Sequence, residues 1–195
     1  MRIVGGSLRG LKLAELGAGD PAAHLRPTTD RVREAIFNLL VNGRHGNPLP
    51  GARVLDLFAG TGALGIEALS RGAAHLTLVD EGRAAQGLIR QNLKLARCAD
   101  RARLVARDAT RLGAADIAPH DLVFLDPPYA QGLGEAALAS AHQGGWIAPG
   151  ATILWEESRP PRLPAWARLL DQRSYGGTVV SLLRLPPKAA DGTEM

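Results

Sequence analysis

The 195-residue sequence predicts an α/β protein built on a doubly wound, mostly parallel sheet. From residue 52 onward, short apolar runs alternate with helical patterns, as repeated βα units require. A glycine turn at Gly60–Gly62 joins the first run to its helix, which is typical of this fold class. Near the C-terminus, two strand-like runs flank a glycine-containing turn. We therefore expect an antiparallel hairpin at one edge of the sheet.

The expected elements follow one another at short intervals. Parallel strands are expected at residues 54–58, 76–79, 102–106, 122–125 and 152–155. Helices are expected at residues 63–70, 83–97 and 135–141, with a short helix after Asp108. The C-terminal hairpin is expected to comprise residues 167–172 and 178–185. We assign residues 51–185 to one domain and expect residues 186–195 to form a disordered tail.

Residues 1–50 form a predicted N-terminal extension. Two short runs, Arg2–Val4 and Leu11–Leu13, flank a glycine-rich centre and predict a small β-hairpin. A helix is then expected to run to about Val41. Its start is marked by three residues that favour the N-cap position, Thr28, Thr29 and Asp30.

Several classes of protein are disfavoured by composition. No apolar run approaches the ~20 residues that span a bilayer, and the first six residues lack the apolar core of a signal peptide. We therefore expect a cytoplasmic protein with no membrane partner, and a monomer as the default. Cys98 is the only cysteine, which excludes an intrachain disulfide and favours a packing role. The five histidines lack metal-ligand spacing, so no metal is expected.

The charge distribution favours a nucleic-acid partner. The formal net charge is +4, and 20 of the 23 basic residues are arginine, which suits phosphate contacts and stacking on bases. Residues 1–12 carry three basic side chains and no acid. The predicted RNA contacts are Arg2, Arg9, Lys12, Arg26, Arg31 and Arg33. For Arg31 and Arg33, a solvated helix face is the competing interpretation.

The most informative motif is Asp126-Pro127-Pro128-Tyr129, which follows an expected buried strand. In open α/β sheets, ligands bind at the carboxyl ends of the strands. The prolines offer carbonyl acceptors but no N–H donors, so the turn can accept hydrogen bonds from an amino group while Tyr129 stacks on a flat ring. This chemistry suits the exocyclic amine of a nucleobase. A plain proline-rich turn is the alternative.

The glycine turn predicts a nucleotide-like cofactor. Gly60-x-Gly62-x-x-Gly65 followed by Asp80 matches the dinucleotide fingerprint. However, Asp56 lies just before the glycines, where a carboxylate would repel a pyrophosphate. S-adenosylmethionine carries a cationic amino group and a sulfonium instead. Asp56 suits these cations, Asp80 the ribose diol and Asp108 the adenine amino group; each acid could otherwise be a helix cap or a loop acid.

The predicted site residues therefore fall into two groups. The catalytic group is Asp126, Pro127, Pro128 and Tyr129. The cofactor group is Asp56, Phe58, Ala59, Gly60, Thr61, Gly62, Asp80, Glu81, Asp108 and Ala109.

These motifs resemble those of the amino-group methyltransferases of the class I, Rossmann-like fold. The N-terminal block narrows the likeness, because residues 1–6, 9–10 and 26–38 resemble the bacterial 16S ribosomal RNA guanine-N2 methyltransferases, the RsmD family. The runs 62–73 and 173–176 match as well, so the likeness covers nearly the whole chain. The resemblance implies methyl transfer from S-adenosylmethionine to the exocyclic N2 of a guanine in 16S ribosomal RNA, either free or in an assembling small subunit. We accordingly assign the N-terminal extension, residues 1–50, to docking of this RNA.

Three alternatives remain at this point. An adenine-N6 methyltransferase acting on DNA or RNA would use the same Asp-Pro-Pro-Tyr turn, although such DNA enzymes generally carry a larger recognition region. A nicotinamide-dependent oxidoreductase would need a substrate domain and a hydride-transfer acid, and the sequence suggests neither. A non-catalytic RNA-binding module would not need the catalytic motifs.

Overall fold

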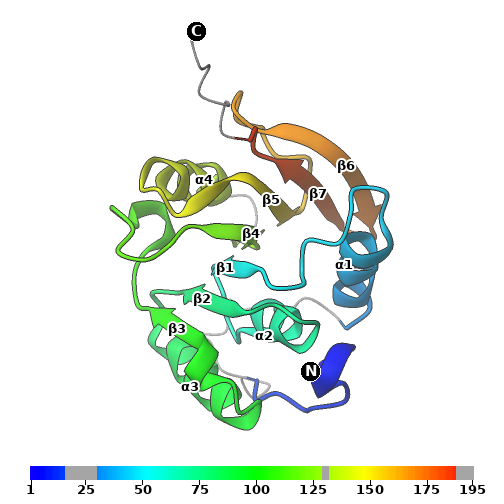
Figure 1. Ribbon diagram of the computed structural model, residues 1–195, viewed down its shortest axis with the longest axis vertical. Helices are drawn as coiled ribbons and strands as arrows, with labels where there is room; N and C mark the ends of the chain where they lie inside the picture. Colours follow the sequence, from blue (N-terminus) through cyan, green and yellow to red (C-terminus); the bar gives the residue numbers. More distant parts are fainter. Residues whose placement is uncertain (16–29, 129–131, 188–195) are drawn as a thin grey trace, which may run out of the picture.

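The computed structural model describes residues 1–15, 30–128 and 132–187. Its centre is a seven-stranded sheet with the order β3-β2-β1-β4-β5-β7-β6, visible in Figure 1. The parallel strands are β1 (Arg53–Leu57), β2 (His75–Val79), β3 (Ala102–Val105), β4 (His120–Leu125) and β5 (Ile147–Glu157). The antiparallel edge comprises β6 (Arg168–Tyr175) and β7 (Thr178–Arg184).

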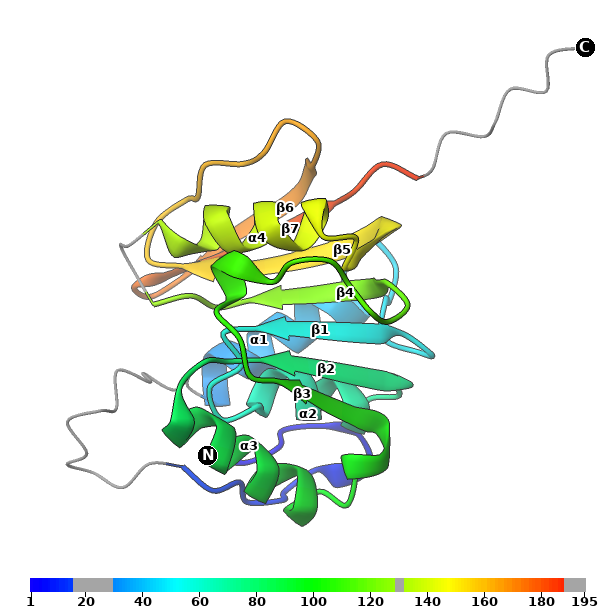
Figure 2. The same ribbon diagram turned by 90° about the vertical axis from the view of Figure 1, so that its left-hand side faces the viewer.

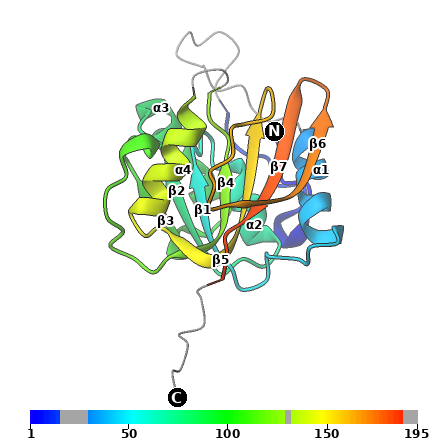
Figure 3. The ribbon, with the colours of Figure 1, turned by 90° about the horizontal axis from the view of Figure 1, so that it is seen from above.

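Helices cover both faces of this sheet, so the predicted doubly wound α/β fold is confirmed. The helices are α1 (Asp30–Asn42), α2 (Ala63–Ser70), α3 (Arg83–Leu95) and α4 (Leu133–Gln143), with 3-10 turns η1 (Gly6–Leu8), η2 (Ala99–Arg101) and η3 (Ala109–Arg111). Phe37, Ile66 and Ile89, from α1, α2 and α3, belong to one hydrophobic cluster, whereas Leu138 of α4 belongs to another. Figure 3 shows α1 and α4 on opposite sides of the sheet.

The strands join these two clusters because their side chains alternate between the faces. In β1, Val54 lies in the cluster beneath α1 and α2, and Leu55 in the cluster beneath α4. Both are fully buried. Burial on both faces of the sheet explains why the central strands appear in the sequence as continuous apolar runs. Cys98 is also buried in the first cluster, as expected of a packing residue.

The expected elements are confirmed, with the largest boundary difference in β5. This strand begins at Ile147, whereas the sequence predicted a strand at residues 152–155. The early part contains Pro149 and Gly150, which are disfavoured in strand interiors. Here they coincide with a shift in the pairing register between β4 and β5, where Ile147 pairs with His120 and Thr152 with Leu122. An irregular strand start tolerates both residues.

The N-terminal segment forms the expected hairpin-like loop around η1. Arg2 and Lys12 form a single antiparallel bridge, and the Ile3 N–H donates to the Leu11 carbonyl at 2.9 Å. Ile3 is buried in the same cluster as Val54 of β1. The division of the chain at residue 50 stays a prediction. Thr28 and Thr29, the expected capping residues, lie outside the described residues.

Candidate active site

The carboxyl ends of β1, β2 and β4 lie at one edge of the sheet, on the left in Figure 2. The segments that follow these strands are therefore neighbours. The glycine turn follows β1, Asp80 follows β2, and Asp126 follows β4. Since β1 pairs with both β2 and β4, its turn lies between the other two segments. The sequence-predicted site residues are brought to one edge, where this class of sheet binds ligands.

The glycine turn is tightly constrained by its backbone. Phe58, Gly60 and Gly62 have φ values of 60°, 57° and 78°. Only glycine adopts this region freely, so Phe58 stores strain of about 1–2 kcal/mol next to the turn. A Cβ atom at Gly62 would also lie 2.9 Å from the Leu78 side chain. The two glycines thus let the backbone turn sharply against β2 and leave the turn free of side-chain bulk.

Asp80 holds this turn from the neighbouring strand. Its Oδ2 accepts a hydrogen bond from the Gly60 N–H at 2.9 Å, and its Oδ1 accepts one from the Gly82 N–H at 2.9 Å. Burial raises the pKa of the Asp80 carboxyl, and the two backbone hydrogen bonds act in the opposite direction. Each carboxylate oxygen retains a second acceptor site. Asp80 can therefore support the turn and still accept from a ligand hydroxyl.

Asp56 lies beneath the turn with only 1% of its surface exposed. Its Oδ2 accepts a hydrogen bond from the Gly65 N–H at 3.0 Å, in the first turn of α2. Burial is the main cause that raises the pKa of Asp56 to about 8. A buried carboxyl of this kind gains stability as a carboxylate when a cation lies near it. It is therefore suited to a positively charged ligand group.

Asp108 and its neighbours cap a short turn after β3. Its Oδ1 accepts from the Thr110 N–H at 2.8 Å and from the Thr110 hydroxyl at 2.7 Å. These hydrogen bonds lower the pKa of Asp108. Ala109 is buried behind it, and Glu81 is exposed beyond Asp80. Asp108 thus performs the capping role that the sequence left open, and a contact of Asp108, Ala109 or Glu81 with a cofactor stays a prediction.

The Asp126 turn is joined directly to β1. The Asp126 N–H donates to the Leu57 carbonyl in a long hydrogen bond of 3.5 Å. Asp126 is half-buried, Pro127 is buried and Pro128 is exposed. Tyr129 lies outside the described residues, so its stacking role stays a prediction. The described part of the motif places acceptor groups next to the glycine turn.

A carboxylate that sequence reasoning missed lies near the end of β5, beside this turn. Leu125 of β4 pairs with Trp155 of β5, so Glu156 lies at the level of Asp126 in the adjacent strand. Leu125 and Trp155 both face α4, and alternation places the next two residues on the other face. Glu156 is only 2% exposed. In the sequence, the available signal is an acid directly after the apolar run 152–155; its burial and its neighbour Asp126 are visible only in the structure.

Asn92 of α3 is a second missed residue, fully buried beneath the glycine turn. Its Nδ2 donates to the Thr61 carbonyl at 2.9 Å and to the Ala14 carbonyl at 3.0 Å. Its Oδ1 accepts from the Ala14 N–H at 2.7 Å. One side chain therefore ties the turn to the N-terminal segment. The sequence predicted a helix at this position, and nothing in the helical pattern indicates that Asn92 connects two distant segments.

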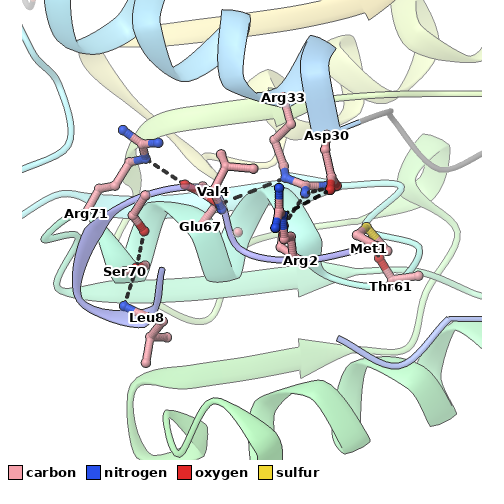
Figure 4. Close-up of polar contacts among 12 residues, drawn as sticks. Met1, Arg2, Val4, Leu8, Asp30, Arg33, Thr61, Glu67, Ser70 and Arg71 are labelled. Carbon is pink, nitrogen blue, oxygen red and sulfur yellow. Dashed lines mark hydrogen bonds and ion pairs between the residues drawn. The ribbon is translucent and has the colours of Figure 1, made fainter. Parts of the chain in front are cut away.

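Arg33 is not an RNA contact, which corrects the sequence-based prediction. Its side chain is fully buried between α1, α2 and the N-terminal segment (Figure 4). It contacts Asp30 Oδ1 at 2.7 Å and donates to the Arg2 carbonyl, and its Nε lies 3.9 Å from Glu67 Oε2. The sequence predicted an exposed side chain here, but the arginine turns inward because two acids and a backbone carbonyl accept its hydrogen bonds and charge.

Glu67 explains why this buried arginine is tolerated. The fully buried carboxylate accepts from the Val4 N–H at 2.7 Å and from Arg71 Nε at 2.8 Å. Next to it, the Ser70 hydroxyl donates to the Gly5 carbonyl at 2.6 Å and accepts from the Leu8 N–H at 2.9 Å. Figure 4 shows this network, which fixes the N-terminal segment on α2.

The other predicted RNA contacts behave differently from Arg33. Arg2, Arg9, Lys12 and Arg31 are exposed. Arg2 lies 3.7 Å from Asp30 and is partly neutralised by it. Arg26 lies outside the described residues. The described part of the N-terminal segment therefore offers a basic surface, and its contact with RNA stays a prediction.

The described residues contain neither a cluster of metal-ligating side chains nor a helix that could span a membrane. No three side chains among histidine, cysteine, aspartate and glutamate cluster so as to hold a metal ion within residues 1–15, 30–128 and 132–187. In the same ranges, no helix combines the length and apolar character needed to cross a membrane.

Comparisons with known proteins agree over nearly the whole chain. The model of the family described as "Conserved hypothetical protein 95" matches residues 1–184. The chain is 40% identical over 196 residues to ribosomal RNA small subunit methyltransferase D of Escherichia coli strain K12, covering 98% of this chain and 92% of that protein. It is 35% identical over 190 residues to the putative rRNA methyltransferase YlbH of Bacillus subtilis, covering 94% and 98%.

A solved structure supports the same assignment. The putative methyltransferase yhhF from Escherichia coli superimposes with a TM-score of 0.79 at 38% identity, covering 96% of this chain and 99% of that one. The predicted class I methyltransferase fold and the RsmD resemblance are thereby confirmed. The chain belongs to the Conserved hypothetical protein 95 family, the RsmD-type methyltransferases.

Proposed function

We propose that this protein uses S-adenosylmethionine to methylate the exocyclic N2 of a guanine in 16S ribosomal RNA. One observation carries the proposal: the Asp126 turn and the glycine turn follow adjacent strands and are joined by the hydrogen bond between Asp126 and Leu57. An acceptor for an amino group thus lies beside the residues suited to a methyl donor. The ribosomal RNA methyltransferases in the family support this reading.

The residues around the glycine turn fit the chemistry of S-adenosylmethionine. When bound, this cofactor supplies a methyl group activated by a positively charged sulfur. Asp56 provides a buried carboxyl for a cationic group, and Asp80 provides acceptors for ribose hydroxyls. The turn itself carries no side chain at Gly60 and Gly62, so its backbone can approach a ligand closely. A phosphate-bearing dinucleotide fits less well, because two acids border the turn and would repel it.

Asp126 and Pro127 are suited to activate the target amine. The lone pair of guanine N2 is delocalised into the ring, which makes the nitrogen a weak nucleophile. Acceptance of its two hydrogens by the Asp126 carboxylate and the Pro127 carbonyl favours rehybridisation and frees the lone pair. Positive charge develops on this nitrogen during transfer; the Asp126 carboxylate stabilises it and accepts the proton that the methylated nitrogen must release. Most of the rate enhancement would come from alignment of the amine with the methyl group.

Glu156 supports guanine as the target rather than adenine. Guanine carries a ring N1–H donor beside its N2 amino group, whereas the ring atoms beside the adenine N6 amino group are acceptors. A second carboxylate next to Asp126 can accept from the guanine N1–H but would repel the lone pair of adenine N1. Such reading of a base edge requires that the base leave its stack.

The direct test is methylation with labelled S-adenosylmethionine and undermethylated small-subunit RNA or particles, followed by nucleoside analysis. We expect N2-methylguanosine. Methylated adenosine would contradict the guanine assignment, and no transfer to either substrate would contradict the whole proposal. Comparison of free RNA with particles identifies the substrate form.

Variants at the strand ends test the residue roles. Asp126→Ala should abolish methylation and leave binding of S-adenosylhomocysteine intact. Asp121→Ala, an exposed acid at the opposite end of the same strand, is the matched control and should retain activity. Glu156→Gln should lower kcat/KM for the guanine substrate by about tenfold or more, because an amide that presents its N–H₂ repels the N1–H. Unchanged rates in Asp126→Ala or Glu156→Gln would overturn the corresponding role.

A further inference from the structure

All charged side chains on the solvent-facing side of α3 are basic. Arg83, Arg90 and Lys94 lie in the helix, Arg97 follows it, and all four are exposed. Residues 83–97 contain no acid. Residues 90, 94 and 97 are spaced by four and three positions, and residue 83 lies seven positions before residue 90. The spacings within the helix align Arg83, Arg90 and Lys94 on one face, and Arg97 adds a fourth cation just beyond the end of the helix.

This stripe lacks the neutralising partners that exposed helices commonly carry. Like charges four residues apart, such as Arg90 and Lys94, destabilise a helix by a few tenths of a kcal/mol. None of the four side chains forms an ion pair with any residue in the described part of the chain. By contrast, Arg33 and Arg71 both contact the buried Glu67. The α3 cations are therefore available to an external anion.

The opposite face of α3 fixes this stripe beside a second basic segment. Asn92 points inward and forms two hydrogen bonds with the backbone of Ala14. Lys12, two residues earlier, is exposed. Figure 2 shows the N-terminal segment running alongside α3. The two basic surfaces are thus held next to each other by a buried contact.

The stripe also begins at the candidate active site. Arg83 is the first residue of α3, immediately after the Asp80–Gly82 turn at the carboxyl edge of the sheet. From there the 13-residue helix extends for about 20 Å, at 1.5 Å per residue. An anionic polymer that reaches the active site can therefore follow the helix away from it.

We propose that the outer face of α3, together with Lys12, binds the phosphate backbone of the RNA that flanks the methylated base. This inference rests on the proposed function, because it takes RNA as the substrate. Charge complementarity identifies the occupant: a regular row of cations without acids suits a polymer with regularly spaced anions. Such contacts position the substrate and contribute little to the choice of base.

The test compares two charge-matched variants. Arg90→Gln/Lys94→Gln removes two charges from the stripe. Arg44→Gln/Arg168→Gln removes two charges from exposed sites in the loop after α1 and on the edge strand β6. For each variant, we would measure the Kd for small-subunit RNA across a salt series, the Kd for S-adenosylhomocysteine and the unfolding curve.

The stripe variant should bind RNA about tenfold more weakly near 0.1 M salt. Its slope of log K against log salt should be smaller by about two, since each phosphate contact contributes roughly one. The control variant should keep the wild-type slope, and both should bind S-adenosylhomocysteine and unfold as wild type does. Equal slopes of log K against log salt in the two variants would overturn the α3 inference. The proposed function would still hold in that case if the wild type methylates RNA. If the wild type neither binds nor methylates RNA, both proposals fail.

Discussion

Asp56 Oδ2 accepts a hydrogen bond from the backbone N–H of Gly65 at 3.0 Å, which joins the end of β1 to the first turn of α2. The N-cap residue of this helix is Gly62, which has no side chain to offer. Asp56, a strand residue, therefore accepts the hydrogen bond from a helix N–H group that the side chain of the N-cap residue normally accepts. The same carboxyl lies beneath the glycine turn, so helix capping and the candidate cofactor site share one residue.

The free energy of unfolding should depend on pH through Asp56. Burial raises its pKa from 3.8 to about 8 in the folded protein, so the folded state holds a proton that the unfolded chain releases between these values. The stabilising contribution is complete below about pH 4 and is lost as the pH rises through about 8. From pH 5 to pH 8, we expect the free energy of unfolding of the wild type to fall relative to that of Asp56→Asn, in denaturant titrations without cofactor, because asparagine does not titrate. The exposed Asp100→Asn serves as control, and a difference independent of pH would contradict the prediction.

Two glycine-to-alanine substitutions should change the free energy of unfolding in opposite directions. A Cβ atom at Gly65 would overlap the Leu76 side chain and lie 3.0 Å from Asp56 Oδ2, whereas one at Gly87 would meet nothing within 4 Å. Gly65→Ala should therefore destabilise the protein by about 1–3 kcal/mol, and Gly87→Ala in α3 should stabilise it by about 0.5–1 kcal/mol. Denaturant unfolding of both variants measures the two effects. An increase in stability for Gly65→Ala would contradict the prediction, because it would mean that a Cβ atom fits at this position.

Substitutions of Arg33 and Arg31 should distinguish a structural role from a role in RNA docking. Arg33→Ala leaves the buried Glu67 without one of its basic neighbours and removes the contact with the Arg2 carbonyl. Loss of one partner of a buried ion pair typically costs about 3–5 kcal/mol. Arg31→Ala, two residues away and exposed, should change stability by less than about 0.5 kcal/mol. Thermal unfolding of both variants checks this; equal melting temperatures would refute the structural assignment of Arg33.

Asn92→Ala should loosen both segments that the side chain connects. The variant leaves the Thr61 carbonyl and both backbone groups of Ala14 without their present partner. We expect a loss of about 1–3 kcal/mol in stability and weaker binding of S-adenosylhomocysteine, because the Gly60–Gly62 turn is no longer held. Calorimetric binding and denaturant unfolding measure these effects. The exposed neighbour variant Gln91→Ala is the control, and identical cofactor affinity in the two variants would contradict the role of Asn92.

The predictable part of the site is the part that is local in sequence. The glycine turn, the acids that end β1 and β2, and the Asp126 turn each follow a short apolar run, and parallel strands bring such ends to one edge. Glu156 and Asn92 escaped prediction for a physical reason. Their importance depends on which strand lies beside Asp126 and which helix lies beneath Thr61, and neither relationship is encoded near those residues.

Arg33 illustrates the same division at the N-terminus. The basic character of the segment is visible in the sequence, but whether an arginine faces water or the core depends on distant partners. Here the deciding residue is Glu67, which lies 34 positions later on another helix. Similarly, Asp108 is visible as a strand-end acid, and only the folded backbone shows that it caps a turn with Thr110.

The sequence alone determined the fold class, the order of strands and helices along the chain and the chemistry available at their ends, because hydrophobic periodicity and turn residues act over a few positions. The tertiary structure decided which cations are buried, which residues cross-link the glycine turn to the N-terminal segment and which basic face remains open to a partner. These properties arise from contacts between residues far apart in the chain. They are settled only when packing selects, for each polar side chain, either water or a partner inside the protein.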